Sequence, residues 1–382
     1  MAGMAAMNMS AFLPSLPGMT EYFGTEYEVM QLSVSLYLAG TAILQLVIGP
    51  ISDRFGRRMV TLWGICIFTV ATVGCLLSPT VEIFLVFRML QGVIAVGLVL
   101  SRAIVRDIHP QEKAASMIGY VTMGMALVPM VAPMIGGALD QAFGWHATFW
   151  MLLVMGLGVL ALCWTDLGET AASDGMSFRQ QLTEYPELLR SRRFWGYVFS
   201  AAFASGAFFA FLGGAPWVAS NIYGLTPFQS GICFGAPAVG YALGNGISGR
   251  YSVRFGVNWM VKVGSVAAVI GLSIATLLAI AGFDSALVFF GFFTFVGVGN
   301  GMVIPNASSG MLSVRPRLAG TASGLGASIM IGGGAALSVL AGVVLELGYG
   351  SIPLLILMTV SLTLGLISIL YVIRRESELN IT

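Results

Sequence analysis

The sequence predicts an all-α integral membrane protein in which twelve transmembrane helices form two six-helix bundles related by pseudo-symmetry. Three observations predict this fold class: the composition, a series of apolar runs, and a turn sequence that occurs once in each half. Of the 382 residues, 57% are hydrophobic and only 9% are charged, whereas about 25% are charged in an average soluble domain. A surface exposed to water would need more polar groups than this chain supplies.

Twelve apolar runs are each long enough to cross a bilayer, which takes about 20 residues. In the first half they cover residues 1–19, 29–48, 60–77, 81–100, 115–139 and 147–167. In the second half they cover residues 194–211, 228–248, 259–281, 286–304, 319–345 and 349–373. We therefore expect an N-terminal six-helix bundle over residues 1–168, a cytoplasmic linker over 169–193, and a C-terminal six-helix bundle with a short cytoplasmic tail over 194–382.

The basic residues fall on one side of this topology, apart from Arg88 inside the fourth span. They follow spans 2, 4, 8, 10 and 12 or lie in the linker: Arg54, Arg57, Arg58, Arg102, Arg106, Lys113, Arg179, Arg190, Arg192, Arg193, Arg250, Arg254, Lys262, Arg315, Arg317, Arg374 and Arg375. The opposite loops carry acids: Glu21, Glu26, Glu28, Glu82, Asp140, Asp284 and Glu346. Since basic loops stay in the cytoplasm, we expect a multi-pass protein of the inner (cytoplasmic) membrane with both termini cytoplasmic.

The sequence lacks the residues that several other functions would require. A net charge of +1 provides no basic surface for nucleic acid. The four cysteines and two histidines lie within or at the ends of apolar runs, without a CxxC pair, so we expect no metal site. The sequence contains no P-loop and no GxSxG motif, so we expect neither an enzyme nor a cofactor.

The N-terminal apolar run lacks the features of a cleaved signal peptide. No basic residue precedes its apolar core, and Pro14 and Pro17 stand where a small-residue cleavage site would lie. We interpret this run as a retained first span. It begins at Met1 with no cytoplasmic flank, which is consistent with a native start upstream.

The sequence GPISDRFGRR at residues 49–58 follows the second span, and Arg-Phe-Gly recurs at residues 254–256 after the eighth. Gly49 and Gly56 permit close helix approach and a sharp turn, and the Asp53 carboxylate can face the positive end of a helix. With the twelve spans, this segment resembles the G-x-x-x-D-R-x-G-R-R signature of the major facilitator superfamily. The resemblance implies two bundles that rock about a central cavity, with Asp53 latching the outward-facing state against the eleventh span.

Arg88 lies inside the fourth span, followed by Gln91 and Gly92. A cation at this depth is costly, so it normally faces a watery cavity or a partner, or else snorkels to the interface. The segment resembles the R-x-x-Q-G motif of the superfamily, which is associated with proton-coupled transport.

The fifth span contains Pro129 and Pro133, followed by the pair Gly136 and Gly137. Proline kinks a helix and glycine pairs allow close contact between helices. The segment resembles the antiporter motif that ends in G-P-x-x-G-G, except that Ala132 replaces the glycine before the proline. This resemblance favours export over uptake.

The sequence FLPSLP at residues 12–17 and the segment Arg102–Asp107 resemble the bicyclomycin/chloramphenicol-resistance subfamily of drug:proton antiporters. That subfamily commonly has an aspartate four residues before the first proline of span 1. This chain has Ser10 at that position. Membrane carboxylates usually carry the proton in such exporters, so Ser10 leaves the proton-carrying residue open.

The helix positions and the resemblance together define the candidate site residues. The expected substrate-binding residues are Asn8, Tyr37, Arg88, Met123, Tyr241, Asn245 and Asn300. The expected proton-coupling or gating residues are Asp53, Arg54, Arg88, Arg106 and Asp140. One buried cation without a buried anion favours neutral or anionic amphipathic substrates over lipophilic cations.

The preferred hypothesis is a monomeric secondary exporter of amphipathic small molecules or drugs, driven by protons, in the lipid bilayer. A second hypothesis keeps the fold but makes the protein a dedicated metabolite or siderophore exporter, which Ser10 favours. A membrane sensor would need a larger soluble domain, and a channel would need a pore loop or charged ring.

Overall fold

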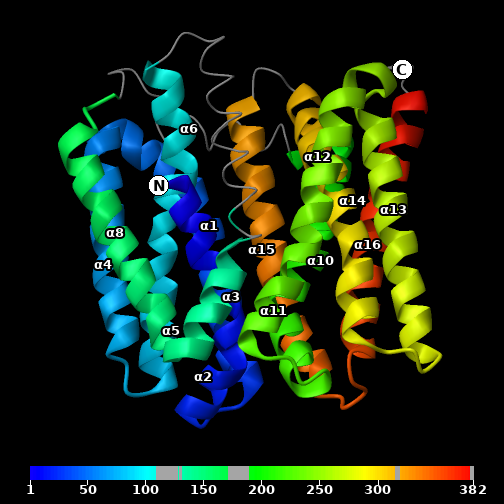
Figure 1. Cartoon of the computed structure of the whole chain (residues 1–382). Helices are drawn as coiled ribbons and strands as arrows, with labels where there is room; N and C mark the ends of the chain where they lie inside the picture. Colours follow the sequence, from blue (N-terminus) through cyan, green and yellow to red (C-terminus); the bar gives the residue numbers. More distant parts are fainter. Residues whose placement is uncertain (109–127, 129–130, 171–188, 315–318, 379–382) are drawn as a thin grey trace. The chain divides into compact units, whose positions relative to one another are not determined.

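The computed structural model describes residues 1–108, 128, 131–170, 189–314 and 319–378. Within these ranges the chain is helical and contains no β-strand (Figure 1). Helices satisfy every backbone hydrogen bond within one segment, which is what apolar runs in lipid require.

The first half contains a series of helices that follow the predicted spans. They are α1 (Ala2–Ser10), the 3₁₀ turn η1 (Leu13–Ser15), α2 (Leu16–Phe23), α3 (Tyr27–Phe55), α4 (Arg57–Leu76), α5 (Val81–Leu90), the 3₁₀ turn η2 (Gln91–Ala95), α6 (Val96–Ile108), a helix over 131–143, and α8 (His146–Asp166). Two predicted spans are interrupted: the first at Ala11 and Phe12, and the fourth by η2. Pro14 lies in the first turn of η1, where its missing N–H leaves no helical bond unmade.

The second half contains longer helices. They are α10 (Arg192–Trp217), the π-helical turn η3 (Val218–Ile222), α11 (Pro227–Cys233), α12 (Gly235–Phe255), α13 (Val257–Ile280), α14 (Ala286–Val314), α15 (Ala319–Leu345) and α16 (Ile352–Glu378). Helix α14 continues ten residues past its predicted end at Ile304 and contains Pro305. Helix α16 continues past Ile373, where Arg374 and Arg375 pair with Glu378 one turn later.

Nine helices among the described residues are long and apolar enough to cross a membrane. They are Tyr27–Ile48, Arg57–Leu76, Val81–Val105, His146–Asp166, Arg192–Ile222, Val257–Ile280, Ala286–Val314, Gly324–Leu345 and Ile352–Glu378. The protein is therefore a multi-pass membrane protein, and the total of twelve spans stays a prediction because part of the chain lies outside the described residues.

The chain forms two compact units, one of Met1–Gln180 with Leu225–Ile232, and one of Gln181–Gly224 with Cys233–Thr382. In the first unit, α4 packs against α8 and α3 packs against α5. In the second unit, α10 packs against α14, α15 and α16, and α14 also packs against α12 and α13 (Figure 1). A buried apolar core that includes Phe194, Val198 and Met311 joins α10, α13, α14, α15 and α16.

The repeated Arg-Phe-Gly sequence forms the same turn in both units. Gly56 joins α3 to α4 with φ +90°, and Gly256 joins α12 to α13 with φ +83°. Residues with a Cβ rarely adopt this conformation. The prediction of matching tight turns after the second and eighth spans is confirmed.

Candidate functional site

Arg88 is the largest of the fully buried side chains among the described residues, with 1% of its surface exposed. It lies in the last turn of α5, just before the 3₁₀ turn η2. Because the guanidinium is enclosed by protein, Arg88 does not snorkel to the membrane interface, and that alternative is wrong. The side chain instead turns toward α1 and α3.

Polar groups from α1 and η2 hold the guanidinium of Arg88. Its Nη1 donates to Asn8 Oδ1 at 2.8 Å and to Gln91 Oε1 at 2.7 Å, and its Nη2 donates to the Asn8 carbonyl at 2.8 Å. The amide nitrogen of Gln91 then donates to Thr72 Oγ1 on α4 at 2.7 Å. The network links residues up to 80 positions apart. The sequence identified Gln91 only as part of the motif that follows Arg88, and it did not identify Thr72.

Two aromatic rings complete the site. The Arg88 Cζ lies 4.1 Å from the ring centroid of Phe12 and 4.6 Å from that of Tyr37. The Tyr37 hydroxyl donates to the Ala5 carbonyl on α1 at 3.4 Å. An aromatic face attracts a cation, and more strongly where water is excluded. The structure therefore brings together three of the predicted binding residues, Asn8, Tyr37 and Arg88.

Among the described residues, no carboxylate contacts the Arg88 guanidinium. Its positive charge is balanced instead by carbonyl dipoles and ring faces. The Asn8 carbonyl lies in the last turn of α1, which ends at Ser10, so the partial negative charge of that helix end faces the guanidinium. Two buried polar atoms of the cluster, Arg88 Nε and Asn8 Nδ2, have no partner among the described residues.

The other predicted binding residues lie in the second unit. Tyr241 and Asn245 lie on α12, where the Asn245 amide donates to the Tyr241 carbonyl at 2.9 Å. Asn300 is buried on the neighbouring α14, and its Oδ1 has no partner among the described residues. The three residues lie on two helices that pack closely, but their relation to the Arg88 cluster is a prediction.

The basic turn after α3 is held by acids from two other segments. The Nε of Arg57 lies 3.2 Å from Asp107 Oδ2 at the end of α6. The Glu169 carboxylate accepts from the backbone N–H of Arg57 at 2.7 Å and of Arg58 at 3.3 Å, and so caps the positive end of α4. A Cβ at Gly56 would lie 2.3 Å from Glu169 Oε2. The sequence did not identify Arg57 or Glu169 as site residues.

The predicted coupling residues are only partly visible. Arg54 is exposed, with its Cζ 5.4 Å from the Phe55 ring centroid. Asp140 lies one residue past the predicted fifth span, where burial raises the pKa of its carboxyl and the nearby Ser15 hydroxyl lowers it less. The described residues do not include Met123 or Pro129. They also leave out the side chains of Asp53 and Arg106 and the surroundings of Gly49.

The motif glycines of the fifth span lie at close backbone contacts. A Cβ at Gly136 would lie 1.7 Å from the Ala11 carbonyl oxygen, and one at Gly137 would lie 2.2 Å from that of Pro227. Pro133 is buried in the same helix. At Gly92 an added Cβ would meet only ordinary contacts, 3.6 Å from Thr41 Oγ1.

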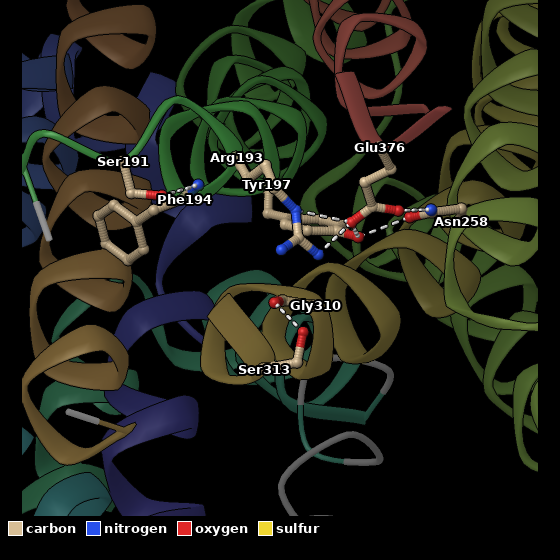
Figure 2. Close-up of polar contacts among 8 residues, drawn as sticks. All are labelled: Ser191, Arg193, Phe194, Tyr197, Asn258, Gly310, Ser313 and Glu376. Carbon is tan, nitrogen blue, oxygen red and sulfur yellow. Dashed lines mark hydrogen bonds and ion pairs between the residues drawn. The ribbon is translucent and has the colours of Figure 1, made fainter. Parts of the chain in front are cut away.

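A second buried polar cluster lies at one end of the second unit (Figure 2). The Glu376 carboxylate on α16 accepts from Arg193 Nε at 2.9 Å and from the Tyr197 hydroxyl at 3.1 Å. Asn258 on α13 donates to the same carboxylate and accepts from Tyr197 at 2.7 Å. A Cβ at Gly310 would lie 2.4 Å from the Tyr197 ring, so the absence of a side chain there makes room for the ring.

The cluster around Glu376 ties the ends of α10, α13 and α16 together. The sequence did not predict this cluster, because Glu376 lies beyond the predicted twelfth span, which ends at residue 373. The sequence does contain a signal, because Glu376 directly follows the arginine pair Arg374 and Arg375.

Comparison with known proteins identifies the family of this chain. The sequence pattern of the Major Facilitator Superfamily matches residues 1–339. The chain belongs to this superfamily. Superfamily members are transporters, so at family level the protein is a transporter and not an enzyme.

Several superfamily relatives are similar over most of this chain. An uncharacterized MFS-type transporter, YdgK, of Bacillus subtilis is 32% identical over 85% of this chain and 82% of its own length. The chloramphenicol resistance protein of Pseudomonas aeruginosa is 30% identical over 83% and 76%. Multidrug resistance protein D of Escherichia coli is 28% identical over 91% and 88%.

A solved transporter structure has the same fold. It is a bacterial homolog of the human lysosomal transporter Spinster in an inward-facing, occupied conformation. It aligns with a TM-score of 0.73 at 18% identity, over 97% of this chain and 94% of its own. At this identity the likeness shows the fold alone.

Proposed function

We propose that this protein is a secondary active exporter of amphipathic small molecules, including drugs, that works by alternating access and proton antiport. The relatives named for chloramphenicol and multidrug resistance support drug export. The two units and their matching glycine turns support movement of one bundle against the other.

We infer the substrate class from the Arg88 cluster. A buried cation that is balanced by neutral groups leaves the site electropositive. A lipophilic cation would be repelled there, whereas a neutral or anionic amphipathic compound could accept hydrogen bonds from Arg88 Nε or Asn8 Nδ2. We include Tyr37, Met123, Tyr241, Asn245 and Asn300 in the same proposed binding site.

Proton coupling needs a group that gains and loses a proton during transport. Asp53 and Asp140 are the proposed carriers, and Arg88 modulates their charge, with Arg54 and Arg106 at the gate. A raised pKa supports Asp140, because the carboxyl then accepts a proton at a less acidic pH than an ordinary aspartate. At the position of the subfamily aspartate, the buried Ser10 hydroxyl donates to the Ala6 carbonyl at 3.1 Å and does not titrate.

Ser10 is also the observation that favours a second candidate, a dedicated exporter of one metabolite or siderophore. In both cases we propose that the protein acts as a monomer in the inner membrane, with both termini in the cytoplasm.

Efflux of a panel of unrelated drugs from everted vesicles tests the proposal, with the pH gradient imposed and then collapsed by an ionophore. Gradient-dependent transport of several neutral or anionic compounds is the expected result. No transport of any panel compound by folded, inserted protein would contradict multidrug export and favour the dedicated exporter.

A further inference from the structure

A surface groove lies between α10 and α16, at the end of the second unit that holds the Glu376 cluster. It encloses about 220 Å³ and is lined by Arg192, Tyr371, Arg374, Arg375 and Glu378. One turn away, α10 packs closely on α16: a Cβ at Gly196 would lie 2.2 Å from Val372 Cγ2. Neither the family assignment nor the transport site explains this groove.

The groove is electropositive. Three guanidinium groups face one carboxylate, and Glu378 engages only Nε of Arg374 at 3.2 Å and Nη1 of Arg375 at 2.9 Å. Each guanidinium has five N–H donors, so most remain for another ligand. The neighbouring Arg193 differs, because its charge is matched by the buried Glu376 (Figure 2). Two positive charges in excess are therefore concentrated at the groove.

An exposed apolar stripe leads along α16 to this groove. Val360, Leu364, Ile367 and Tyr371 are 51%, 41%, 55% and 44% exposed, and their spacing of four, three and four residues places them on one helix face. On α10, the exposed Phe199 stacks on Trp195, with ring centroids 5.1 Å apart. Within a membrane, these side chains lie where acyl chains run.

We propose that the groove binds the headgroup of an anionic phospholipid, such as phosphatidylglycerol, with its acyl chains along the α16 stripe. Guanidinium groups bind phosphate oxygens in pairs, and tyrosine favours the level of the headgroups. Basic pockets between transmembrane helices bind anionic lipids in this way. The bound lipid bridges α10 and α16 from outside, as Glu376 bridges them from inside.

The test measures lipid binding to the delipidated full-length protein by native mass spectrometry, with titrations of phosphatidylglycerol and phosphatidylcholine. The groove variant carries Arg192→Gln, Arg374→Gln and Arg375→Gln. The matched control carries Arg250→Gln, Arg254→Gln and Lys262→Gln, which removes equal charge from exposed positions on α12 and α13 of the same unit. A further variant, Glu378→Gln, removes the one carboxylate of the groove.

We expect phosphatidylglycerol to bind at least about tenfold more tightly than phosphatidylcholine, and the groove variant to lose at least about tenfold in affinity. The control should stay within about twofold of the parent protein, and Glu378→Gln should bind more tightly. Equal losses in both triple variants, or no preference for the anionic lipid, would overturn the proposal. If the groove variant does not fold, unchanged affinity in Glu378→Gln would overturn it. Displacement of the lipid by equimolar inorganic phosphate would assign the groove to a soluble anion instead.

Discussion

At the scale of single residues, the protein keeps a cation inside the membrane without an acid beside it among the described residues. Arg88 is stabilised by two side-chain amides, one backbone carbonyl and two aromatic rings. Only a planar, forked donor can reach all these groups at once. The arginine is therefore specified by geometry as well as by charge.

Replacing Arg88 with lysine should abolish most transport although the charge is kept. The compact ammonium cannot bond to both oxygens of Asn8 and to Gln91 while lying between the rings of Phe12 and Tyr37. We expect Arg88→Lys to retain less than about one tenth of parent export and to lose about 2 kcal/mol of stability. Drug efflux and thermal melting in detergent measure both effects. The control is Arg250→Lys at an exposed position of α12. Parent-like export by Arg88→Lys would refute the claim that the forked guanidinium of Arg88 is required.

The proposed proton carriers give a second prediction at this scale. Asp53→Asn and Asp140→Asn each mimic a permanently protonated carboxyl, so at least one of them should uncouple export from the pH gradient. If Asp140 carries the proton, coupling in the parent protein should weaken above the pH at which this carboxyl loses its proton. Because burial raises the pKa of Asp140, that pH is higher than for an ordinary aspartate. Asp166→Asn, an exposed aspartate at the end of α8, serves as the control. Gradient-driven export that survives in the Asp53→Asn, Asp140→Asn double variant would exclude both carriers.

At the scale of helices, small residues set the packing of α12 on α14. Added Cβ atoms at Gly240, Gly244, Gly297 and Gly301 would lie 2.0–2.5 Å from carbonyl oxygens of the facing helix. Each pair is spaced four residues apart, so the glycines line one face of each helix. This contact carries Tyr241, Asn245 and Asn300, and it fixes their positions within the second unit.

Valine at Gly244 should therefore destabilise the second unit. Its Cβ would approach the Val298 carbonyl oxygen to 2.1 Å, and overpacking of this kind costs about 1–3 kcal/mol. We expect a clear fall in the melting temperature of the detergent-solubilised protein. Gly246→Val is the matched control, because Gly246 lies on the same helix with open space around it. Equal melting temperatures for the two variants would refute this account of the contact.

The sequence predicted the helices well but missed what interrupts and extends them. Apolar runs place most spans because length and hydropathy decide membrane crossing. The break at Ala11 and Phe12 follows the end of α1 at Ser10, four residues before Pro14, whose ring would clash with the Ser10 carbonyl in a continuous helix. Beyond the predicted end of α16, its arginines pair with Glu378. Neither follows from hydropathy alone.

The sequence predicted only part of the candidate site. A buried arginine stands out in an apolar run, so Arg88 was identified from the sequence. Its partners Asn8 and Gln91 include one residue 80 positions away, and such a contact depends on how α1 packs on η2 and α6. The Glu376 cluster joins three helices, which no single sequence window contains.

At the scale of the whole molecule, the protein is a superfamily transporter with a polar cluster buried in each unit. The Arg88 cluster in the first unit is the proposed binding element, and the Glu376 cluster in the second unit holds helix ends together. The matching turns at Gly56 and Gly256 indicate that the two units share one design. The central claim is that movement of these units exchanges substrate for protons.

Proton movement in proteoliposomes that contain the purified protein and an internal pH-sensitive dye tests this claim most directly. A substrate gradient applied without a pH gradient should drive protons in the opposite direction to the substrate. The Arg88→Lys variant should abolish the signal. Transport of radiolabelled substrate without any change in internal pH, under electrically neutral conditions, would contradict proton antiport.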